Sequence, residues 1–448
     1  MNLENHRASL SWSSQVILWL YEFLWYLALP VALLRLFWKS RLQKEYRQNI
    51  SERLGFYNKK LTNNIVWVHA VSVGETRAAA PLIHALIGDG YQILLTHMTP
   101  TGRETGSNIF SKEIDAGQLQ QVYLPYDISF LVAPFFRTFS PKLGLIMETE
   151  VWPNLVLKAQ RLNIPTLLVN ARLSKRSARR VATFGSTGSA IYGAFSQILA
   201  QTAIDAKRYQ SLDLSNVTVT GNVKFDVEMN ASQIDHALQI RKLIPSSIRL
   251  ICAASTREGE EEMIIQAWLL CLKQSPTILP YARLLIVPRH PQRFEQVFQD
   301  ILSKNLDAVK RSNLNDQQLV EAIQAGSIVL GDSMGEMSFY YALSDVVVMG
   351  GSLQPLGGQN FIEACSLGRP IILGEHTFNF QQASMDAIEQ GAALRVAGTE
   401  ELSQQMNNLI QNDVLREKMS ANAIDFASQH TGATKKILAV IQTYIAIR

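Results

Sequence analysis

Cysteine is scarce in this 448-residue chain, and the three that occur, Cys252, Cys271 and Cys365, lie far apart in apolar surroundings. An odd number of widely spaced cysteines argues against a disulfide framework and is typical of proteins kept in a reducing compartment. The eight histidines are scattered, without a pair four residues apart and without a cysteine partner. The sequence therefore shows no zinc site.

Three motifs that bind nucleotides are also missing. There is no GxxxxGK[ST], and indeed no Gly-Lys dipeptide, which excludes a P-loop NTPase. No GxGxxG follows an expected strand, which argues against a dinucleotide-dependent dehydrogenase. No Asp-x-Asp occurs, so the carboxylates that often hold a metal ion against nucleotide phosphates are absent. This last absence favours chemistry without a metal ion.

The composition is that of a folded protein. Hydrophobic residues make up 47% of the chain and charged residues 18%, and the length suits two globular domains. The formal net charge of +4 is compatible with an anionic ligand. It falls short of the dense positive charge of a nucleic-acid-binding protein, so we expect no nucleic-acid partner.

The N-terminus carries a long apolar run from Val16 to Leu34, interrupted by the carboxylate of Glu22 and by Pro30. Roughly 20 apolar residues can cross a bilayer as a helix. A carboxylate near the middle of the bilayer costs about 2.5–3.5 kcal/mol, so a helix lying in the interface or docked on a domain is the alternative. Basic residues follow the run, at Arg35, Lys39, Arg41, Lys44 and Arg47. We therefore expect contact with membrane lipid, with the remainder of the chain on the cytoplasmic side.

After residue 65, short apolar runs alternate with helical stretches, as in parallel sheets covered on both faces. Runs in the first half lie at 65–70, 92–96, 122–125, 144–147, 166–170, 198–201 and 217–222, and those in the second half at 250–255, 284–290, 327–332, 345–351 and 370–374. The pattern predicts two doubly wound α/β domains. We expect a membrane-associated helix and basic flank at 1–45, a first domain at 46–226, a linker at 227–247 and a second domain with terminal helices at 248–448.

Ligands bind beyond the carboxyl ends of parallel strands, and the loops there hold unusual residues. Glu75 follows the first strand in VSVGE, where it is either a functional acid or a first-turn acid that complements the helix dipole. Lys224, in GNVKFD, suits a phosphate or carboxylate, or is a surface lysine. The sequence around each residue alone leaves both interpretations open.

Glu148 and Glu150 follow the fourth strand in METEVWPN. On an extended segment the two carboxylates point the same way and perturb each other's pKa, which suits acid–base chemistry. The alternative is capping of the helix that Trp152 and Pro153 open. We favour a functional role, because a strand's carboxyl end is a costly place for two charges.

Four successive strands of the second domain end in loops rich in small residues, at 254–261, 288–291, 331–337 and 350–360. Such loops leave backbone N–H groups and helix N-termini free to receive a phosphate. Arg289 adds a planar donor, and Glu336 and Glu363 can accept hydrogen bonds from ribose or base. The second domain is therefore expected to bind a nucleotide.

A basic cluster follows the fifth strand of the first domain, at Arg172, Lys175, Arg176, Arg179 and Arg180. Such a run is commonly a solvated helix face, but in a chain with a membrane helix it also suits an anionic lipid head group.

The ordered set of these motifs resembles the bacterial Kdo transferases, which move 3-deoxy-D-manno-octulosonic acid (Kdo) from CMP-Kdo to the lipid A precursor. The resemblance runs from Tyr46 to Asn379 and rests on VSVGE, METEVWPN, NARLS, TGNVKFD, ASTREGEE, PRHPQRF, GDSMGE, GGS and GGQNFIEA. It implies a GT-B fold, in which two Rossmann-like domains face a cleft, with the acceptor in the first and the donor in the second. It also implies an inverting reaction of lipopolysaccharide biosynthesis without a cofactor, in contact with inner-membrane lipid.

The resemblance carries roles to individual positions. Glu75 matches the family's catalytic base, and Glu148 and Lys224 match its transition-state stabilisers. The CMP-binding segments match Pro288, Arg289, Met334, Gly335, Glu336, Asn360, Phe361, Ile362 and Glu363. For the acceptor phosphate we name Arg172, Lys175 and Arg176, from the basic cluster.

Two other functions remain as alternatives. Another GT-B transferase or a sugar-nucleotide epimerase shares the glycine-rich second domain but has no reason to carry VSVGE and METEVWPN together. A non-catalytic, membrane-tethered sugar-nucleotide binder needs the donor loops but not Glu75.

Overall fold

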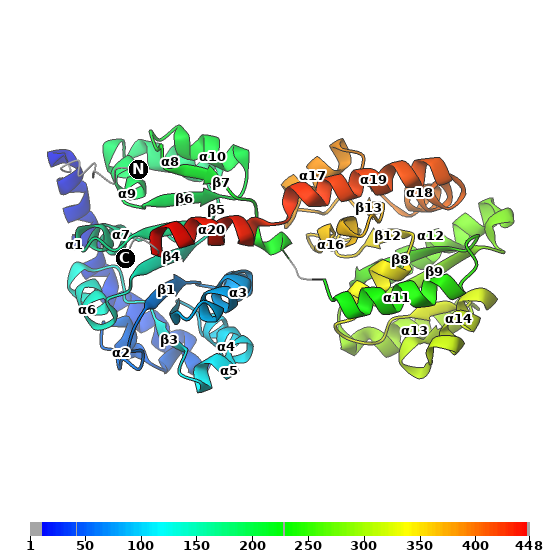
Figure 1. Cartoon of the computed structure of the whole chain (residues 1–448), viewed down its shortest axis with the longest axis horizontal. Coiled ribbons are helices and arrows are strands. Elements are labelled where there is room, and N and C mark those ends of the chain that lie inside the picture. Colours follow the sequence, from blue (N-terminus) through cyan, green and yellow to red (C-terminus); the bar gives the residue numbers. More distant parts are fainter. Residues whose placement is uncertain (1–10, 42, 227–228, 446–448) are drawn as a thin grey trace. The chain divides into compact units, whose positions relative to one another are not determined.

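The computed structural model describes residues 11–41, 43–226 and 229–445. These residues form two compact units (Figure 1). The first unit contains the chain up to Asp226 and the segment from Gly432 onward, and the second unit contains the residues between them.

The first unit is built on a parallel sheet of seven strands among its described residues, in the order β3-β2-β1-β4-β5-β6-β7. The order reverses between β1 and β4, which is the switch point at which doubly wound sheets bind ligands. The strands are β1 (Ile65–His69), β2 (Gln92–His97), β3 (Leu119–Tyr123), β4 (Leu143–Met147), β5 (Thr166–Ala171), β6 (Gln197–Ala200) and β7 (Val217–Val219).

The second unit repeats this plan, with seven parallel strands in its described part and the order β10-β11-β9-β8-β12-β13-β14. Its switch point lies between β8 and β12, beside the glycine-rich loops. The strands are β8 (Arg249–Thr256), β9 (Ala282–Pro288), β10 (Ala308–Lys310), β11 (Ile328–Leu330), β12 (Val346–Met349), β13 (Ile371–Leu373) and β14 (Ala393–Arg395).

The predicted parallel α/β class is confirmed, and each apolar run overlaps a strand. The sequence missed β10 and β14, which are edge strands of three residues each and too short for a periodic pattern. It also placed β3 too late, because the polar residues Gln120 and Gln121 belong to that strand.

Helices cover both faces of each sheet. In the first unit they are α1 (Trp12–Lys39), α2 (Ile50–Arg53), α3 (Val73–Gly88), α4 (Pro100–Ile109), α5 (Ser111–Asp115), α6 (Ser129–Phe139), α7 (Pro153–Arg161), α8 (Lys175–Thr183), α9 (Ser186–Gly193), α10 (Ala203–Gln210) and α20 (Ala433–Ile445). In the second they are α11 (Ala231–Leu243), α12 (Glu260–Gln274), α13 (Phe294–Ser303), α14 (Asp316–Ala325), α15 (Met337–Leu343), α16 (Ile362–Ser366), α17 (Gln381–Glu389), α18 (Thr399–Gln411) and α19 (Asp413–His430).

The two ends of the second unit differ from the expected boundaries. The segment expected to be a linker contains α11, whose Ala237 and Ile240 are buried, so this helix belongs to the second unit; residues 227–228 lie outside the described chain. The last helix, α20, belongs to the first unit (Figure 1), because its Ala433, Ile437 and Ile441 are buried in the same core as α3 and the first sheet. Sequence order alone had assigned α20 to the second domain.

Helix α1 lies along the first unit beside α6, α7 and α9 (Figure 1). One stripe of the helix faces the unit, with buried or half-buried side chains at Ser14, Leu18, Tyr21, Trp25, Leu29, Leu33 and Leu36. These positions recur every three or four residues, which is the period of one helix face. Other faces expose large apolar side chains, among them Trp19, Leu20, Phe23, Leu24 and Leu27. By length and composition the helix could cross a bilayer.

Candidate functional site

Glu75 lies in the first turn of α3, directly beyond the end of β1. Ser72 is the N-cap of this helix, and its hydroxyl accepts a hydrogen bond from the Glu75 N–H (3.4 Å) and donates one to Glu75 Oε1 (2.8 Å). The N–H of Val71 donates to Glu75 Oε2 (2.9 Å). Burial raises the pKa of Glu75, and these hydrogen bonds oppose that rise only in part. Glu75 therefore occupies the first-turn position expected of an acid that complements the helix dipole, and the same residue has a perturbed pKa.

The loop that carries Glu75 is packed against the start of α4. Thr99 donates a hydrogen bond to the Val71 carbonyl (2.8 Å). A Cβ added at Gly102 would come within 2.7 Å of that same carbonyl, so only glycine allows α4 to approach this closely. The residues that follow the neighbouring strand β2 thus hold the loop that carries Glu75 in place.

Glu148 adopts a left-handed conformation, with φ of 56°. This conformation is uncommon for a residue other than glycine, and such strain tends to cluster at functional sites. The expectation of an extended segment from Glu148 to Glu150 is wrong, because the chain turns immediately after β4. The turn instead directs Glu148 toward Lys224, whose Nζ lies 2.6 Å from Glu148 Oε1.

Lys224 is placed by two residues that the sequence had not singled out. Asn170, at the end of β5, accepts a hydrogen bond from the Val223 N–H through its side-chain oxygen (3.2 Å). Asp226 accepts hydrogen bonds from the N–H groups of Gly432 (2.6 Å) and Thr434, at the start of α20. The short helix η2 (Val223–Phe225) is therefore fixed at both ends. Asn170 falls within the motif NARLS and Asp226 within TGNVKFD, and these motifs were the only indication in the sequence that the two residues matter.

Glu150 is the third carboxylate of this cluster. The pKa of Glu150 is raised to about 7, chiefly by burial and also by the charges of Glu75 and Glu148, while the indole of Trp152 opposes the rise. The charges of Glu148 and Lys224 in turn act on the pKa of Glu75. The structure thus brings Glu75, Glu148, Glu150 and Lys224 into one electrostatic group at the carboxyl edge of the first sheet. A group of this kind can take up a proton near neutral pH and stabilise developing charge.

The residues expected to bind CMP lie in the second unit, beyond its strands. Arg289 follows β9 and is exposed, and its charge lowers the pKa of Glu363, which burial raises. Asn360 donates a hydrogen bond from its side chain to Glu363 Oε1 (2.9 Å) and accepts one from the Ile362 N–H (3.2 Å). Arg289, Asn360 and Glu363 therefore form one polar group that can bind a nucleotide.

Other expected CMP-binding residues differ in what they offer a ligand. Met334 is exposed, and Glu336, at the N-cap of α15, accepts a hydrogen bond from the Ser333 hydroxyl. The side chains of Phe361 and Ile362 are buried, and Phe361 stacks on Phe426 in the core. Those two residues can therefore meet a ligand only through their backbone. Pro288 is buried and Gly335 is exposed.

A buried carboxylate organises the glycine-rich loop after β12. Glu260 is fully buried and accepts hydrogen bonds from the N–H groups of Gly351 (2.6 Å), Leu353 (2.9 Å) and Arg257 (2.8 Å). A Cβ at Gly350 would lie 2.3 Å from the Ser255 carbonyl, so this loop passes directly over the end of β8. The sequence placed Glu260 within ASTREGEE but gave no reason for its role.

The basic cluster maps to α8 and the loop before it. Arg172, Lys175, Arg176, Arg179 and Arg180 are all exposed. Within the described chain none of them forms an ion pair, and the last four line a surface pocket with Thr183. In the same described residues, no three His, Cys, Asp or Glu side chains are placed to share a metal ion.

The fold defines the class of protein. A solved glycosyltransferase from Rickettsia africae aligns with 86% of this chain and 99% of its own, at 13% identity and a TM-score of 0.52. With two Rossmann-like units, each on a seven-stranded parallel sheet in its described part, the chain has the GT-B fold.

The sequence comparisons give the family. A family model described as 3-deoxy-D-manno-octulosonic-acid transferase (kdotransferase) matches residues 48–227. The 3-deoxy-D-manno-octulosonic acid transferase of Bordetella pertussis is 40% identical over 85% of this chain and 87% of its own length. The enzyme of that name from Haemophilus influenzae is 34% identical over 89% of this chain and 92% of its own. The chain belongs to the 3-deoxy-D-manno-octulosonic acid transferase family and is a glycosyltransferase.

Proposed function

We propose that this enzyme moves Kdo from CMP-Kdo to a sugar hydroxyl of the lipid A precursor, lipid IVA, with inversion and without a metal ion. The observation that carries the proposal is the group of three carboxylates and one lysine at the carboxyl edge of the first sheet. The charges of Glu148 and Lys224 act on the pKa of Glu75, those of Glu75 and Glu148 act on the pKa of Glu150, and Lys224 contacts Glu148 directly at 2.6 Å.

Glu75 is the proposed general base. A sugar hydroxyl is a poor nucleophile, so its proton must leave as its oxygen attacks the anomeric carbon of Kdo. The new glycosidic bond forms as the bond from that carbon to the CMP phosphate oxygen breaks. Glu75 receives the proton, and CMP leaves with the electron pair. One direct displacement of this kind inverts the anomeric centre.

In this proposal, positively charged side chains stabilise the leaving phosphate, as a metal ion does in other transferases. Lys224 provides an ammonium held in place by Glu148, and Arg289 provides a guanidinium at the end of β9. Hydrogen-bond donors and cations already fixed in position stabilise charge that develops in the transition state. CMP-Kdo carries one phosphate, so its demand for countercharge is smaller than that of a nucleotide diphosphate.

The second unit is the proposed CMP site. Its polar contacts come from Arg289, Glu336, Asn360 and Glu363, and backbone contacts come from Gly335 and from Phe361 to Ile362. Pro288 and Met334 provide shape and apolar surface. The raised pKa of Glu363 and the exposed guanidinium of Arg289 support recognition of a base or ribose hydroxyl beside a phosphate.

The acceptor is proposed to reach the first unit from the membrane. The cations of α8, including Lys175 and Arg176 with the preceding Arg172, have no ion-pair partner among the described residues and suit the phosphates of a lipid acceptor. We further propose that α1 lies in the membrane interface on the cytoplasmic side. Its docked stripe extends from Ser14 to Leu36, which leaves no free length to cross the bilayer away from the unit.

The test is mass spectrometry of the product formed by purified enzyme from CMP-Kdo and lipid IVA, with and without EDTA. We expect a lipid IVA heavier by one or more Kdo units and an unchanged rate in EDTA. Loss of activity in EDTA with recovery on addition of Mg²⁺ would contradict the metal-independent reaction. Release of free Kdo without a lipid product would contradict the acceptor.

A further inference from the structure

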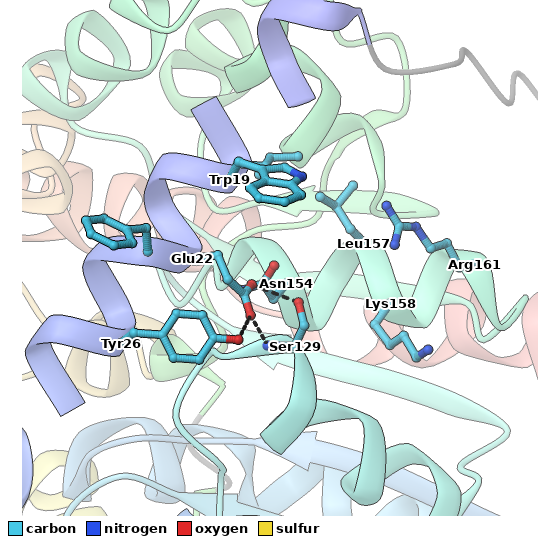
Figure 2. Close-up of a pocket in the computed structure, with 10 residues that line it drawn as sticks. Trp19, Glu22, Tyr26, Ser129, Asn154, Leu157, Lys158 and Arg161 are labelled. Atoms are coloured by element: carbon cyan, nitrogen blue, oxygen red, sulfur yellow. Dashed lines mark hydrogen bonds between the residues drawn. The ribbon is translucent and has the colours of Figure 1, made fainter. Parts of the chain in front are cut away.

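Glu22, the carboxylate that interrupts the apolar run of α1, is bound to the first unit (Figure 2). Its Oε1 accepts a hydrogen bond from the Ser129 N–H (2.9 Å), and its Oε2 accepts from the Ser129 hydroxyl (2.8 Å) and from Asn154 Nδ2 (2.8 Å). Ser129 begins α6 and Asn154 lies in the first turn of α7. The charge of Glu22 thus joins the starts of two helices, beside a pocket of about 480 Å³.

A second carboxylate, that of Asp127, also binds the start of α7. Asp127 accepts hydrogen bonds from the N–H groups of Asn154 (3.0 Å) and Leu155 (2.9 Å), which are free donors at the start of a helix. The hydroxyl of Tyr21, on α1, donates to the same carboxylate (2.9 Å). The start of α7 is therefore held by α1 both directly, through Glu22, and through Asp127.

Aromatic contacts continue from α1 toward the catalytic group. The ring centroid of Trp25 lies 5.8 Å from that of Tyr126 and 6.4 Å from that of Trp152. Trp152 is the N-cap of α7 and the second residue after Glu150. One layer of side chains therefore separates α1 from the loop that carries Glu148 and Glu150.

We propose that α1 positions this acidic loop, and that Glu22 and Trp25 are positioning residues for the transfer reaction. The inference rests on the proposed function, because it concerns the rate of that reaction. The loop between β4 and α7 is short, so fixing Trp152 and Asn154 fixes the place of Glu148, whose left-handed turn depends on both ends being held. The helix that contacts the membrane is thereby also a support of the catalytic site.

The two sides of α1 consequently have separable roles. Glu22 and Trp25 face the unit, whereas Leu24, on another face of the helix, is 55% exposed. Loss of a contact on the docked side displaces the acidic loop and lowers kcat. Loss of apolar surface on the exposed side weakens attachment to a lipid surface and raises KM for an acceptor presented there.

The test compares Glu22→Gln, Trp25→Ala and Trp25→Phe with Leu24→Ala, using CMP-Kdo and lipid IVA in vesicles. Glu22→Gln and Trp25→Ala are expected to lower kcat by about 10- to 100-fold, as small displacements of catalytic groups do, with little change in KM for CMP-Kdo. Trp25→Phe keeps an aromatic ring against Trp152 and is expected to stay within about threefold of the original kcat. Leu24→Ala should raise KM for lipid IVA and leave kcat unchanged.

Vesicle flotation measures the membrane binding of each variant, and circular dichroism measures its folding. If Glu22→Gln, folded and bound to vesicles, keeps its kcat, the positioning role is wrong. The same conclusion follows if Leu24→Ala lowers kcat as much as Trp25→Ala does, because α1 then acts only through attachment. If Trp25→Ala does not fold, Glu22→Gln and Trp25→Phe still decide the question. Failure of the proposed function itself is distinct, since the unaltered enzyme would then form no product at all.

Discussion

Glu75 shows how one side chain can satisfy two interpretations that compete when only the sequence is known. Its carboxylate accepts hydrogen bonds at the start of its own helix, and it also lies in a group of interacting charges. A carboxylate has about four lone-pair positions, and the two hydrogen bonds from Val71 and Ser72 use only two of them. The remaining positions can accept a proton from a substrate. These hydrogen bonds therefore orient the carboxylate and leave it able to serve as the base that we propose.

The sequence singled out Glu75, Glu148 and Lys224 through the distinctive motifs that contain them, and the structure brings their charges together. It misjudged the relation of Glu148 to Glu150, since a left-handed turn cannot be read from Glu-Thr-Glu. It also underrated Glu150, whose raised pKa depends on burial and on the charges of Glu75, in α3, and Glu148.

The pKa of Glu150 makes the stability of the first unit depend on pH. Its pKa is raised from 4.5 to about 7 in the folded protein, so between these values the folded state holds a proton that the unfolded state has lost. This group therefore favours folding at low pH, and its contribution declines as the pH rises toward 7 and is lost above it. Glu150→Gln, which cannot ionise, should remove this dependence.

We expect Glu150→Gln to gain about 1 to 2 kcal/mol in the free energy of unfolding relative to the original protein between pH 5 and pH 8, after allowance for solvent screening. Urea unfolding of both proteins at the two pH values measures the difference. The comparison cancels the titration of the buried His69 and His97, which both proteins share. An equal pH dependence in the two proteins would show that Glu150 has an ordinary pKa.

At the scale of secondary structure, the alternation of apolar runs was enough to predict both parallel sheets. It could not assign α20, because a helix's partner is set by its buried face and not by its place in the sequence. Nor could it reveal that Glu22 is bound, since Ser129 and Asn154 lie more than 100 residues away. The carboxylate of Glu22, whose charge is unfavourable in a spanning helix, binds α1 to the first unit.

Helix α20 should stabilise the first unit. Ile437 is fully buried in the core formed with α3 and the first sheet. Ile437→Ala leaves a cavity there and is expected to lower the free energy of unfolding by about 2 to 5 kcal/mol. Chemical denaturation followed by the fluorescence of Trp67, which lies in the first unit, measures this loss, with the exposed Val414→Ala as a control. A loss no larger than the control's would mean that α20 is not part of that core.

At the scale of the whole molecule, the docked stripe of α1 makes a specific prediction about topology. If α1 lies in the interface, Ser11 at its N-cap is on the same side of the membrane as the catalytic residues. If α1 spans the bilayer, Ser11 is on the opposite side. The three native cysteines are buried, so a cysteine introduced at this position is the one expected to react with a thiol reagent.

We expect Ser11→Cys, in intact spheroplasts, to resist a membrane-impermeant maleimide and to react with it after lysis. An accessible cysteine in a protein known to face the periplasm serves as the positive control. Labelling of Ser11→Cys before lysis would establish a spanning helix and overturn the interfacial arrangement.

The central claim, that Glu75 is the base of Kdo transfer to a lipid A precursor, is tested most directly by the product of Glu75→Gln. Glutamine keeps one oxygen to cap α3 but cannot take a proton at neutral pH, so folding and CMP binding should persist. Mass spectrometry of the lipid formed from CMP-Kdo and lipid IVA should show Kdo-bearing product with the unaltered enzyme. With Glu75→Gln, the rate should fall by about 100- to 10,000-fold. Turnover near that of the unaltered enzyme would contradict the account.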